Sequence, residues 1–244
     1  MPTLSIILPC FNEEDVITTT VGRVMKWIQA GHSDAEVIVV NNASTDNTLK
    51  VLDNLCQQYP LLRVVRRDVN GGCGASVRSG CDAARGEIIA YMDSDGQFAV
   101  EDFDLLLSHL SSTDFVSGIR AHREDPRMRL ILSGVWNMVN RVLFRLRARD
   151  IDCGMKAFRR GTWPVIRPVI TIGDAFNAEL YFRLQKSGLR WTQVPVRHFP
   201  RLTGKSGSVR VYDMFKAISE TLHLFFATCC RKLPRSPSST NAAT

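Results

Sequence analysis

Hydrophobic positions along the first hundred residues fall into two alternating patterns. Short runs rich in Ile, Val and Leu predict buried strands at residues 3–8, 36–40, 62–65 and 87–92. Apolar residues at helical spacing predict helices at residues 15–30, 47–57 and 74–85. Strands that alternate with helices predict an α/β domain with a mostly parallel sheet and right-handed crossovers.

Polar clusters follow three of these predicted strands. They cover residues 9–14, 41–46 and 93–97. In open parallel sheets, ligands bind at the carboxyl ends of the strands. We therefore expect these clusters to meet in one site.

The second half of the chain has a different pattern. Apolar residues at helical spacing predict a helix over 128–146, and further helices at 174–187 and 211–225. A loop and short strand are expected at 151–160, and a strand at 190–196. We divide the chain into one domain over 1–210, an amphipathic helix over 211–232 and a disordered Ser/Pro-rich tail over 233–244.

Composition indicates the cellular compartment of the protein and the class of partner that it binds. No stretch has about 20 consecutive apolar residues, and the N-terminus lacks the features of a signal peptide. The seven cysteines show no CxxC pair, which indicates reduced thiols in the cytoplasm. The net charge of +7 favours phosphate-bearing partners without choosing among nucleotide, anionic lipid and nucleic acid.

The sharpest chemical feature is Asp93-Ser94-Asp95, with Gln97 close behind. Two carboxylates at a strand end can share one divalent cation, and Mg²⁺ or Mn²⁺ usually completes its shell with substrate phosphates. The alternative is a solvated loop that caps the next helix. The position directly after a predicted buried strand favours the metal.

Two further segments have a functional and a structural interpretation. Glycines in residues 70–75, Gly72 among them, allow a backbone to approach an anion at a helix start, or simply form a tight turn. In residues 9–14, Phe11 could stack on a base and Glu13 could hydrogen-bond base or ribose. Acids at a helix start are the alternative for Glu13.

Arginines crowd the predicted helix over 128–146 and its flanks. They are Arg120, Arg123, Arg127, Arg129, Arg141, Arg145, Arg147 and Arg149. Interleaved with Trp136, Leu143 and Phe144, they suggest a helix that touches an anionic lipid surface. A solvated helix face packed on the core is the alternative.

Seven segments in the same order resemble the family-2 glycosyltransferases, specifically the dolichyl- or polyprenyl-phosphate mannosyltransferase branch, over roughly residues 3–215. Residues 9–13 are similar to P-T-Y-N-E, and residues 36–46 to E-I-I-V-V-D-D-G-S-T-D. Residues 70–74 match N-x-G-x-G and residues 93–97 match D-A-D-x-Q. The others are 117–120 (G-S/T-R), 152–158 (D-x-x-C/S-G-F-K-x-F) and 195–206 (P-V-x-F-x-x-R-x-x-G-x-S).

The resemblance implies a GT-A, Rossmann-like single domain that binds a nucleotide-sugar donor across its strand ends. It implies that Asp93, Asp95 and Gln97 hold the metal, with Ser94 beside them. Pro9, Phe11, Glu13, Val40 and Asn42 would line the nucleotide, together with Gly72. Arg120 and Arg201 would face the phosphates, and we add Lys205 and Asp152 as candidate catalytic residues.

The chain departs from the family pattern in two notable places. Asn41-Asn42 replaces the acidic pair, whose second member normally contacts the base, so the identity of the base is open. Gly207 stands where the family has its last lysine, with Lys205 and Arg210 nearby. Phe11 for tyrosine and Ala43 for glycine are mild changes.

The expected reaction is inverting transfer from GDP-mannose or a UDP-hexose to a polyprenyl or dolichyl phosphate, whose oxygen is already anionic and needs no strong base. The alternative is transfer to a sugar hydroxyl, with Asp152 or Glu179 as base. A non-catalytic nucleotide- or nucleic-acid-binding module is the alternative of another class, although its acids at 93–95 would repel phosphate without a metal. We expect peripheral membrane attachment through 128–146 and 211–228, with a membrane protein as a further anchor, and no nucleic-acid partner.

Overall fold

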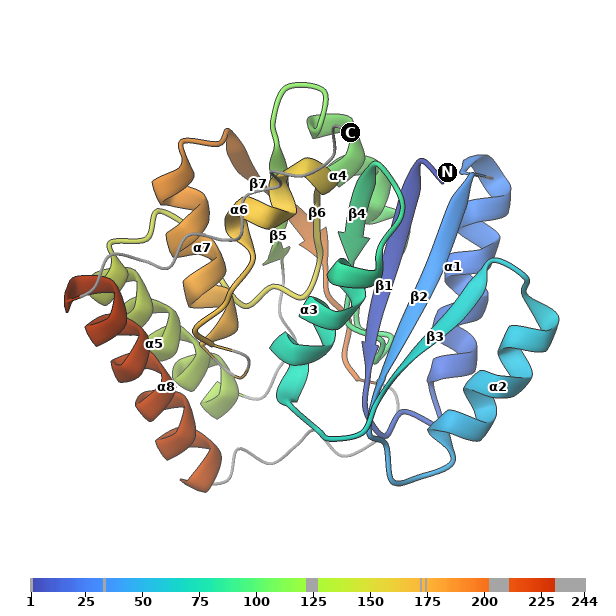
Figure 1. Ribbon diagram of the computed structural model, residues 1–244, viewed down its shortest axis with the longest axis horizontal. Coiled ribbons are helices and arrows are strands. Elements are labelled where there is room, and N and C mark those ends of the chain that lie inside the picture. The colour runs from blue at the N-terminus through green and yellow to red at the C-terminus, as the bar shows by residue number, and fades with distance from the viewer. Residues whose placement is uncertain are drawn as a thin grey trace, which may run out of the picture.

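The computed structural model describes residues 2–32, 34–121, 127–171, 173, 175–201 and 211–230. Its centre is one sheet of seven strands in the order β3-β2-β1-β4-β6-β5-β7 (Figure 1). The strands are β1 (Leu4–Cys10), β2 (Ala35–Asn42), β3 (Leu62–Arg67), β4 (Ile88–Tyr91), β5 (Phe115–Ala121), β6 (Lys156–Arg159) and β7 (Trp191–Arg197).

Strand direction divides the sheet into two parallel groups. β1 pairs in parallel with β2 and β4, β2 pairs in parallel with β3, and β5 pairs in parallel with β7. β6 lies between the groups and runs antiparallel to both β4 and β5. The carboxyl ends of β1, β2, β4 and β5 therefore lie at one edge of the sheet, at the bottom of Figure 1.

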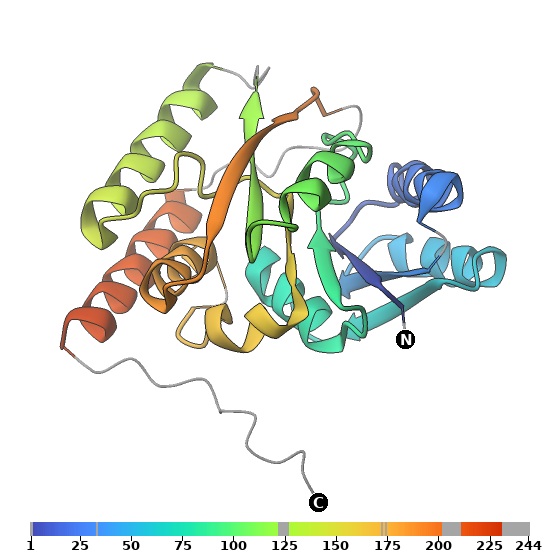
Figure 2. The same ribbon diagram turned by 90° about the horizontal axis from the view of Figure 1, so that it is seen from above.

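Helices cover both faces of the sheet. One face carries α1 (Ile17–Gly31), α2 (Thr48–Gln58) and α4 (Asp102–His109). The other carries α3 (Gly72–Ala83), α6 (Trp163–Ile166), which follows the short η1 (Arg160–Thr162), and α7 (Phe176–Ser187). The last two helices, α5 (Arg127–Phe144) and α8 (Val211–Cys230), lie side by side at one end of the molecule (Figures 1 and 2).

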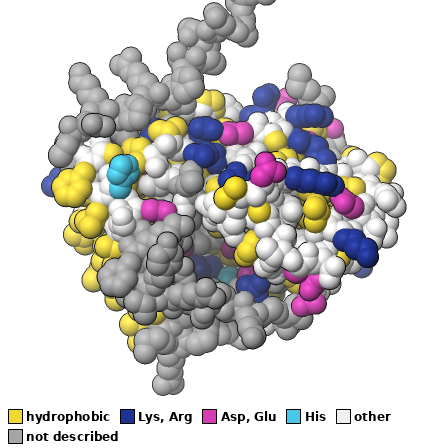
Figure 3. Space-filling model, turned by 60° about the horizontal axis from the view of Figure 1, so that its bottom comes forward, with side chains coloured by type: hydrophobic (Ala, Val, Ile, Leu, Met, Phe, Trp, Pro, Cys, Tyr) yellow, Lys and Arg dark blue, Asp and Glu magenta, His cyan; other side chains and the backbone are white. Residues whose placement is uncertain are grey.

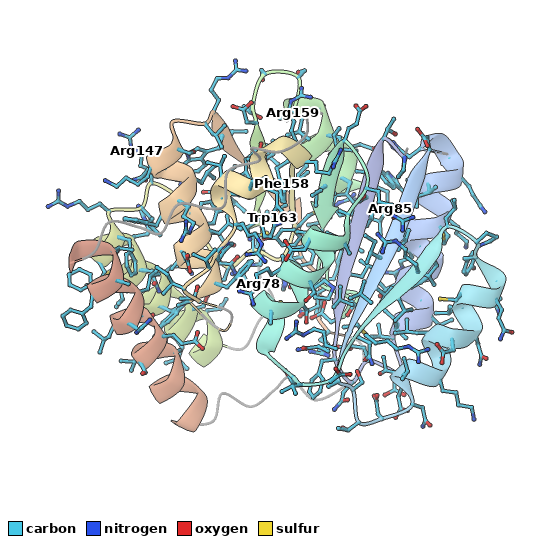
Figure 4. The ribbon with its side chains drawn as sticks, viewed as in Figure 1. Arg78, Arg85, Arg147, Phe158, Arg159 and Trp163 are labelled. Atoms are coloured by element: carbon cyan, nitrogen blue, oxygen red, sulfur yellow. The ribbon has the colours of Figure 1, made fainter. Side chains whose placement is uncertain are left out.

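The hydrophobic pattern explains these layers. On β1, Ile6 and Leu8 point toward the α1 face while Ile7 points toward the α3 face, because successive side chains of a strand alternate. Every residue of β1 and β2 is buried, as expected for strands covered on both sides. Phe158 on β6 stacks on Trp163 of α6, with ring centroids 5.9 Å apart (Figure 4).

The predicted α/β class and mostly parallel sheet are confirmed, and each predicted strand and helix has a counterpart within a few residues. The hydrophobic pattern did not predict α4, the full strand β5 or the antiparallel insertion of β6. Lys205, Arg123, Arg210 and the tail 233–244 lie outside the described residues. Among the residues that are described, none of the helices combines the length and the apolar character needed to cross a bilayer.

Candidate active site

The loops after β1 and β2 are tied to each other at the carboxyl edge of the sheet. Asn12 accepts a hydrogen bond from the backbone N–H of Thr45 (2.8 Å), and its own N–H reaches the Ser44 hydroxyl (3.1 Å). Asn12 and Ala43 both have left-handed backbones, with φ of 53° and 58°. Asparagine tolerates this region, whereas alanine is strained there. Backbone strain of this kind is concentrated at functional sites.

The residues expected to line the nucleotide divide by exposure. Phe11 is 39% exposed, so its ring is available to a ligand. Pro9 is buried, and its carbonyl accepts the hydroxyl of Ser94 (2.8 Å), which ties the end of β1 to the acid loop. Val40 has no exposed surface and packs in the core on the α3 face. The structure therefore places Val40 under the site and Ser94 in a supporting position.

Asn42, at the end of β2, is buried against the glycine loop. Its amide nitrogen donates to Asn70 Oδ1 (2.8 Å) and to the carbonyl of Gly72 (3.2 Å). Its amide oxygen accepts from Arg67 Nε (3.0 Å) and from the N–H of Gly71 (3.2 Å). Gly72 begins α3 with a φ of 83°, a conformation that favours glycine.

The acid loop follows β4. Asp95 Oδ1 accepts the backbone N–H of Gln97 (3.1 Å), which makes a tight turn through Gly96. Gln97 is buried and donates its amide nitrogen to the carbonyl of Phe199 (2.9 Å), while its amide oxygen accepts no hydrogen bond within the described ranges. Among the described residues, Asp93 receives no hydrogen bond on its carboxylate. The carboxylate of Asp93 therefore lies just beyond the end of β4 with no hydrogen-bond donor from the described part of the chain.

Burial and the neighbouring positive charges have opposite effects on the pKa of Asp93. Burial raises the pKa of Asp93 to about 6, and the nearby Asp95 adds to the rise, while Lys156 and Arg120 oppose it. Gly154 faces the same carboxylate so closely that a Cβ there would overlap it. The carboxylate of Asp93 can occupy this position because residue 154 is a glycine.

Arg201 connects two of the predicted site acids. It pairs with Glu13 and lies 3.9 Å from Asp95 Oδ2. Burial raises the pKa of Glu13, and the charge of Arg201 opposes that rise. The structure thus brings Glu13, Asp95 and Arg201 together at the edge of the sheet.

Arg120, expected to face phosphate, makes a two-pronged ion pair with Asp150. Its Nε and Nη2 donate to the two carboxylate oxygens at 2.8 Å each. Burial disfavours the charged arginine, but the hydrogen bonds and charge of Asp150 outweigh burial and raise the pKa of Arg120. Arg120 therefore contributes a fixed charge near Asp93 and Asp152 instead of a free one.

Lys156 and Asn177 were not singled out from the sequence. Lys156 is fully buried between the rings of Tyr91 and Tyr181, with Nζ 5.3 and 5.7 Å from their centroids. Its ammonium donates to the carbonyl of Cys153 (2.6 Å) and to Asn177 Oδ1 (3.2 Å). The lysine of the 152–158 segment was the available signal, but a sequence does not show that a lysine is buried.

Asp152 lies next to this pair. It accepts a long hydrogen bond from Asn177 Nδ2 (3.5 Å), and burial raises its pKa to about 6 despite the opposing charge of Arg120. Glu179, the other base candidate, is fully buried, and its carboxylate accepts the N–H groups of Val169 (2.9 Å) and Thr171 (2.7 Å). The structure gives Glu179 a structural role and leaves Asp152 as the base candidate.

The edge of the sheet that carries these groups faces the viewer in Figure 3. Figure 3, which brings the bottom of Figure 1 forward, shows basic and acidic side chains together in a depression near the centre of this face. No cluster of three or more His, Cys, Asp or Glu with metal-binding geometry occurs within the described ranges. A cation here would need oxygen ligands from a bound substrate as well as from the acids.

Comparison with known proteins identifies the family of this chain. Residues 5–163 match the model of glycosyl transferase family 2. A dolichyl-phosphate beta-glucosyltransferase of Trichomonas vaginalis is 28% identical over 208 residues, 78% of this chain and 62% of that protein. The polyprenol monophosphomannose synthase of Mycolicibacterium smegmatis is 30% identical over 226 residues, 86% of this chain and 84% of that protein.

A solved structure shares the fold. The mannosyltransferase of Pyrobaculum calidifontis in complex with GDP-Man and Mn²⁺ has a TM-score of 0.66 at 19% identity, with 97% of this chain and 66% of that chain covered. This likeness confirms the GT-A fold. The chain spans less than two thirds of the length of the trichomonad relative. Since the family model covers β1 to β4, the acid loop and residues 152–158, the chain belongs to glycosyl transferase family 2.

Proposed function

We propose that this chain transfers a sugar from a nucleotide-sugar donor, GDP-mannose or a UDP-hexose, to the phosphate of a polyprenyl or dolichyl lipid, with inversion at the anomeric carbon. The observation that carries the proposal is the carboxylate of Asp93, which accepts no hydrogen bond from the described residues and lies beside Asp95, just after a parallel strand. Relatives named for dolichyl-phosphate and polyprenol substrates support the class of acceptor.

The acid loop fits a divalent cation, Mg²⁺ or Mn²⁺. Neither the carboxylate of Asp93 nor the amide oxygen of Gln97 accepts a hydrogen bond from the described residues. Two carboxylates with an amide oxygen, completed by phosphate oxygens, are a ligand set that Mg²⁺ and Mn²⁺ accept. When bound, the metal would neutralise the leaving diphosphate.

The protein's own residues would then align the reactants. A lipid phosphate oxygen attacks the anomeric carbon as the bond from that carbon to the diphosphate breaks and the diphosphate leaves with the electron pair. The attacking oxygen is already ionised, so the step needs no proton transfer. Arg201, held by Glu13 beside Asp95, and the fixed charge of Arg120 supply positive potential around the phosphates.

Transfer to a sugar hydroxyl is the second candidate, and one observation favours it. Such a reaction requires a base, and Asp152 has a pKa raised by burial to about 6, in the range useful for proton abstraction near neutral pH. Under the lipid-phosphate proposal, Asp152 only orients the reactants.

An acceptor comparison separates the two. The full chain with Mn²⁺ is given GDP-mannose or UDP-glucose together with either a polyprenyl phosphate or a matched dephosphorylated polyprenyl glycoside. We expect product with the lipid phosphate alone, and Asp152→Asn to retain part of the activity. Product from the glycoside alone, abolished by Asp152→Asn, would establish the second candidate instead.

We further propose that α5 and α8 attach the protein to a membrane surface, with a membrane-protein anchor as an additional contact. Apolar side chains on these helices are strongly exposed: Ile131 61%, Val135 50%, Met138 60%, Val142 71%, Leu222 46% and Phe226 60%. Hydrophobic side chains gather along the left edge of Figure 3, where these helices lie. Single exposed apolar residues are ordinary, but a contiguous group marks an interaction surface.

Basic side chains border this apolar surface. Arg141 and Arg145 line an open hollow with Met138 and Val142. Arg145, Arg147 and Arg149 are exposed in alternation with buried neighbours, and Arg147 lies at the same side of the molecule (Figure 4). Apolar side chains next to arginines suit a bilayer with anionic lipids.

Flotation with vesicles tests this attachment. We expect the chain to float with vesicles that contain anionic lipid, and Val142→Asp combined with Phe226→Asp to abolish flotation. Leu61→Asp, at an exposed apolar position between α2 and β3, is the matched control and should float normally. Equal flotation of both variants would contradict the assignment to α5 and α8.

A further inference from the structure

The amide of Asn42 has no spare hydrogen-bonding capacity. A primary amide carries two donor hydrogens and two acceptor lone pairs. Asn42 uses both donors, toward Asn70 Oδ1 and the Gly72 carbonyl, and both lone pairs, toward Arg67 Nε and the Gly71 N–H. These four partners also fix which end of the amide is nitrogen, because the reversed amide would face two acceptors with its oxygen.

Three of the four partners of Asn42 lie in residues 70–72, which lead into α3, and the fourth, Arg67, is the last residue of β3. Besides its bond to Asn42, Arg67 donates a hydrogen bond from Nη1 to the hydroxyl of Ser79 on α3 (2.7 Å). Gly71 lies so close to Ala75 and Arg67 that a Cβ would come within 2.7 and 2.8 Å of them. Asn42, Arg67 and the first turns of α3 therefore form one hydrogen-bonded unit.

An aspartate could not replace Asn42 in this unit. Its carboxylate would place an oxygen against Asn70 Oδ1 and the Gly72 carbonyl, two acceptors now 2.8 and 3.2 Å from a nitrogen. The side chain of Asn70 could turn, but the backbone carbonyl of Gly72 has no such freedom. The amide is thus what this loop requires at a position where the family pattern has an acid.

We propose that Asn42 is a positioning residue, which holds the glycine loop for the donor nucleotide and does not itself read the base. The group that the loop offers in its place is the amide nitrogen of Asn70. Asn70 is exposed, its oxygen is occupied by Asn42 and by the Gly72 N–H (2.9 Å), and its nitrogen makes no hydrogen bond within the described part of the chain. That nitrogen is a donor suited to a nucleotide oxygen.

The inference rests on the proposed use of a nucleotide-sugar donor, and it predicts how selectivity responds to substitution. If Asn42 acts through the loop, then Asn42→Ala weakens the binding of every nucleoside diphosphate by the same factor. If Asn42 reads the base, the loss differs between UDP and GDP. We expect about tenfold weaker binding of both, which corresponds to one buried hydrogen bond left unmade.

The first measurement is calorimetric titration of the full chain with UDP and with GDP, each with Mn²⁺. The variants are Asn42→Ala, Asn42→Asp and, as matched control, Asn54→Ala at an exposed position of α2. We expect the ratio of the two dissociation constants to stay within about twofold of wild type in Asn42→Ala. A change of that ratio by about tenfold or more would overturn the proposal.

The second measurement does not depend on any nucleotide. Hydrogen exchange of the Gly71 and Gly72 amides should become at least about tenfold faster in Asn42→Ala, while the amides of β1 and β2 report that the variant is folded. Unchanged exchange at both glycines would overturn the positioning role. Wild-type protein that binds neither nucleotide would contradict the proposed function, and the exchange result would still decide the role of Asn42.

Discussion

The two halves of the site differ in the interactions that hold their side chains. The donor loops, residues 9–14, 41–46 and 70–72, are held largely by amides, hydroxyls and backbone groups that satisfy one another. The acid cluster, Asp93, Asp95 and Asp152 with Lys156 and Arg120, contains buried charges. Most polar groups of the first half are paired within the protein, whereas the carboxylates of the second half need a cation or a proton to balance their charge. Substitutions should therefore act through geometry in the first half and through charge in the second.

The largest effect is expected at Asp93. Asp93→Asn removes the carboxylate charge but keeps its size, so transfer should fall by roughly 10³-fold or more, the scale of a lost metal interaction of several kcal/mol. A transfer assay at saturating Mn²⁺ measures it. Asp53→Asn, at an exposed ion pair with Arg66, is the control and should be fully active. Activity above about a tenth of wild type in Asp93→Asn would separate the acid cluster from the chemistry.

Gly154→Ala should produce the next largest effect. The new methyl group would overlap the Asp93 carboxylate and displace it. A displacement on the order of 1 Å at a reacting centre costs about 10²-fold in rate. Gly22→Ala on α1, where a Cβ meets nothing within 4 Å, is the matched control. Wild-type kinetics in Gly154→Ala would show that the position of Asp93 is not critical.

The free energy of unfolding of the metal-free protein should depend on whether the carboxylates of the acid cluster are charged. Burial raises the pKa of Asp93 and of Asp152 to about 6 from an ordinary 3.8. Such groups hold their protons more tightly when folded, so the stability they contribute is present below about pH 4 and is lost as the pH rises to about 6. At pH 8, Asp93→Asn should therefore be more stable than wild type by roughly 1–3 kcal/mol.

The difference between wild type and variant is the quantity to follow, because Asp150 and Asp82 have lowered pKa values and act in the opposite sense. Denaturant unfolding at pH 4 and pH 8, in a chelator, gives this difference. It should shrink toward zero at pH 4. A variant that is less stable than wild type at pH 8 would contradict a destabilising charge at Asp93.

The smallest effect belongs to the donor loops. Ala43 has a φ of 58°, where an L side chain is strained, so Ala43→Gly should raise the free energy of unfolding by about 0.5–1 kcal/mol. Thermal unfolding measures this gain, and nucleotide binding should be unchanged. A loss of stability would mean that the flexibility of glycine in the unfolded chain outweighs the relieved strain.

Much of the fold was predictable because β1, β2 and β4 are largely buried and their sequences are nearly continuous apolar runs, while β3, at the edge of the sheet, still carries an apolar core of Leu62, Val64 and Val65. The position of β6 was not, because its four residues pair with strands distant in the chain and include Lys156. No local pattern records that a lysine will be buried between two tyrosines.

The candidate site shows the same limit. The segments around Asp93, Glu13 and Arg201 were visible as motifs, and the structure gathers them at one edge. What each side chain does depends on its partners: Arg120 is bound to Asp150, Val40 is in the core and Asn42 is saturated by the glycine loop. Those partners come from distant segments, which residue spacing does not reveal.

The most direct test of a metal at the end of β4 is anomalous diffraction from crystals grown with Mn²⁺ and a nucleoside diphosphate. We predict a manganese peak within about 2.5 Å of a carboxylate oxygen of Asp93 or Asp95, in contact with the diphosphate. A manganese ion bound elsewhere, or a diphosphate seated with no metal beside these acids, would contradict it.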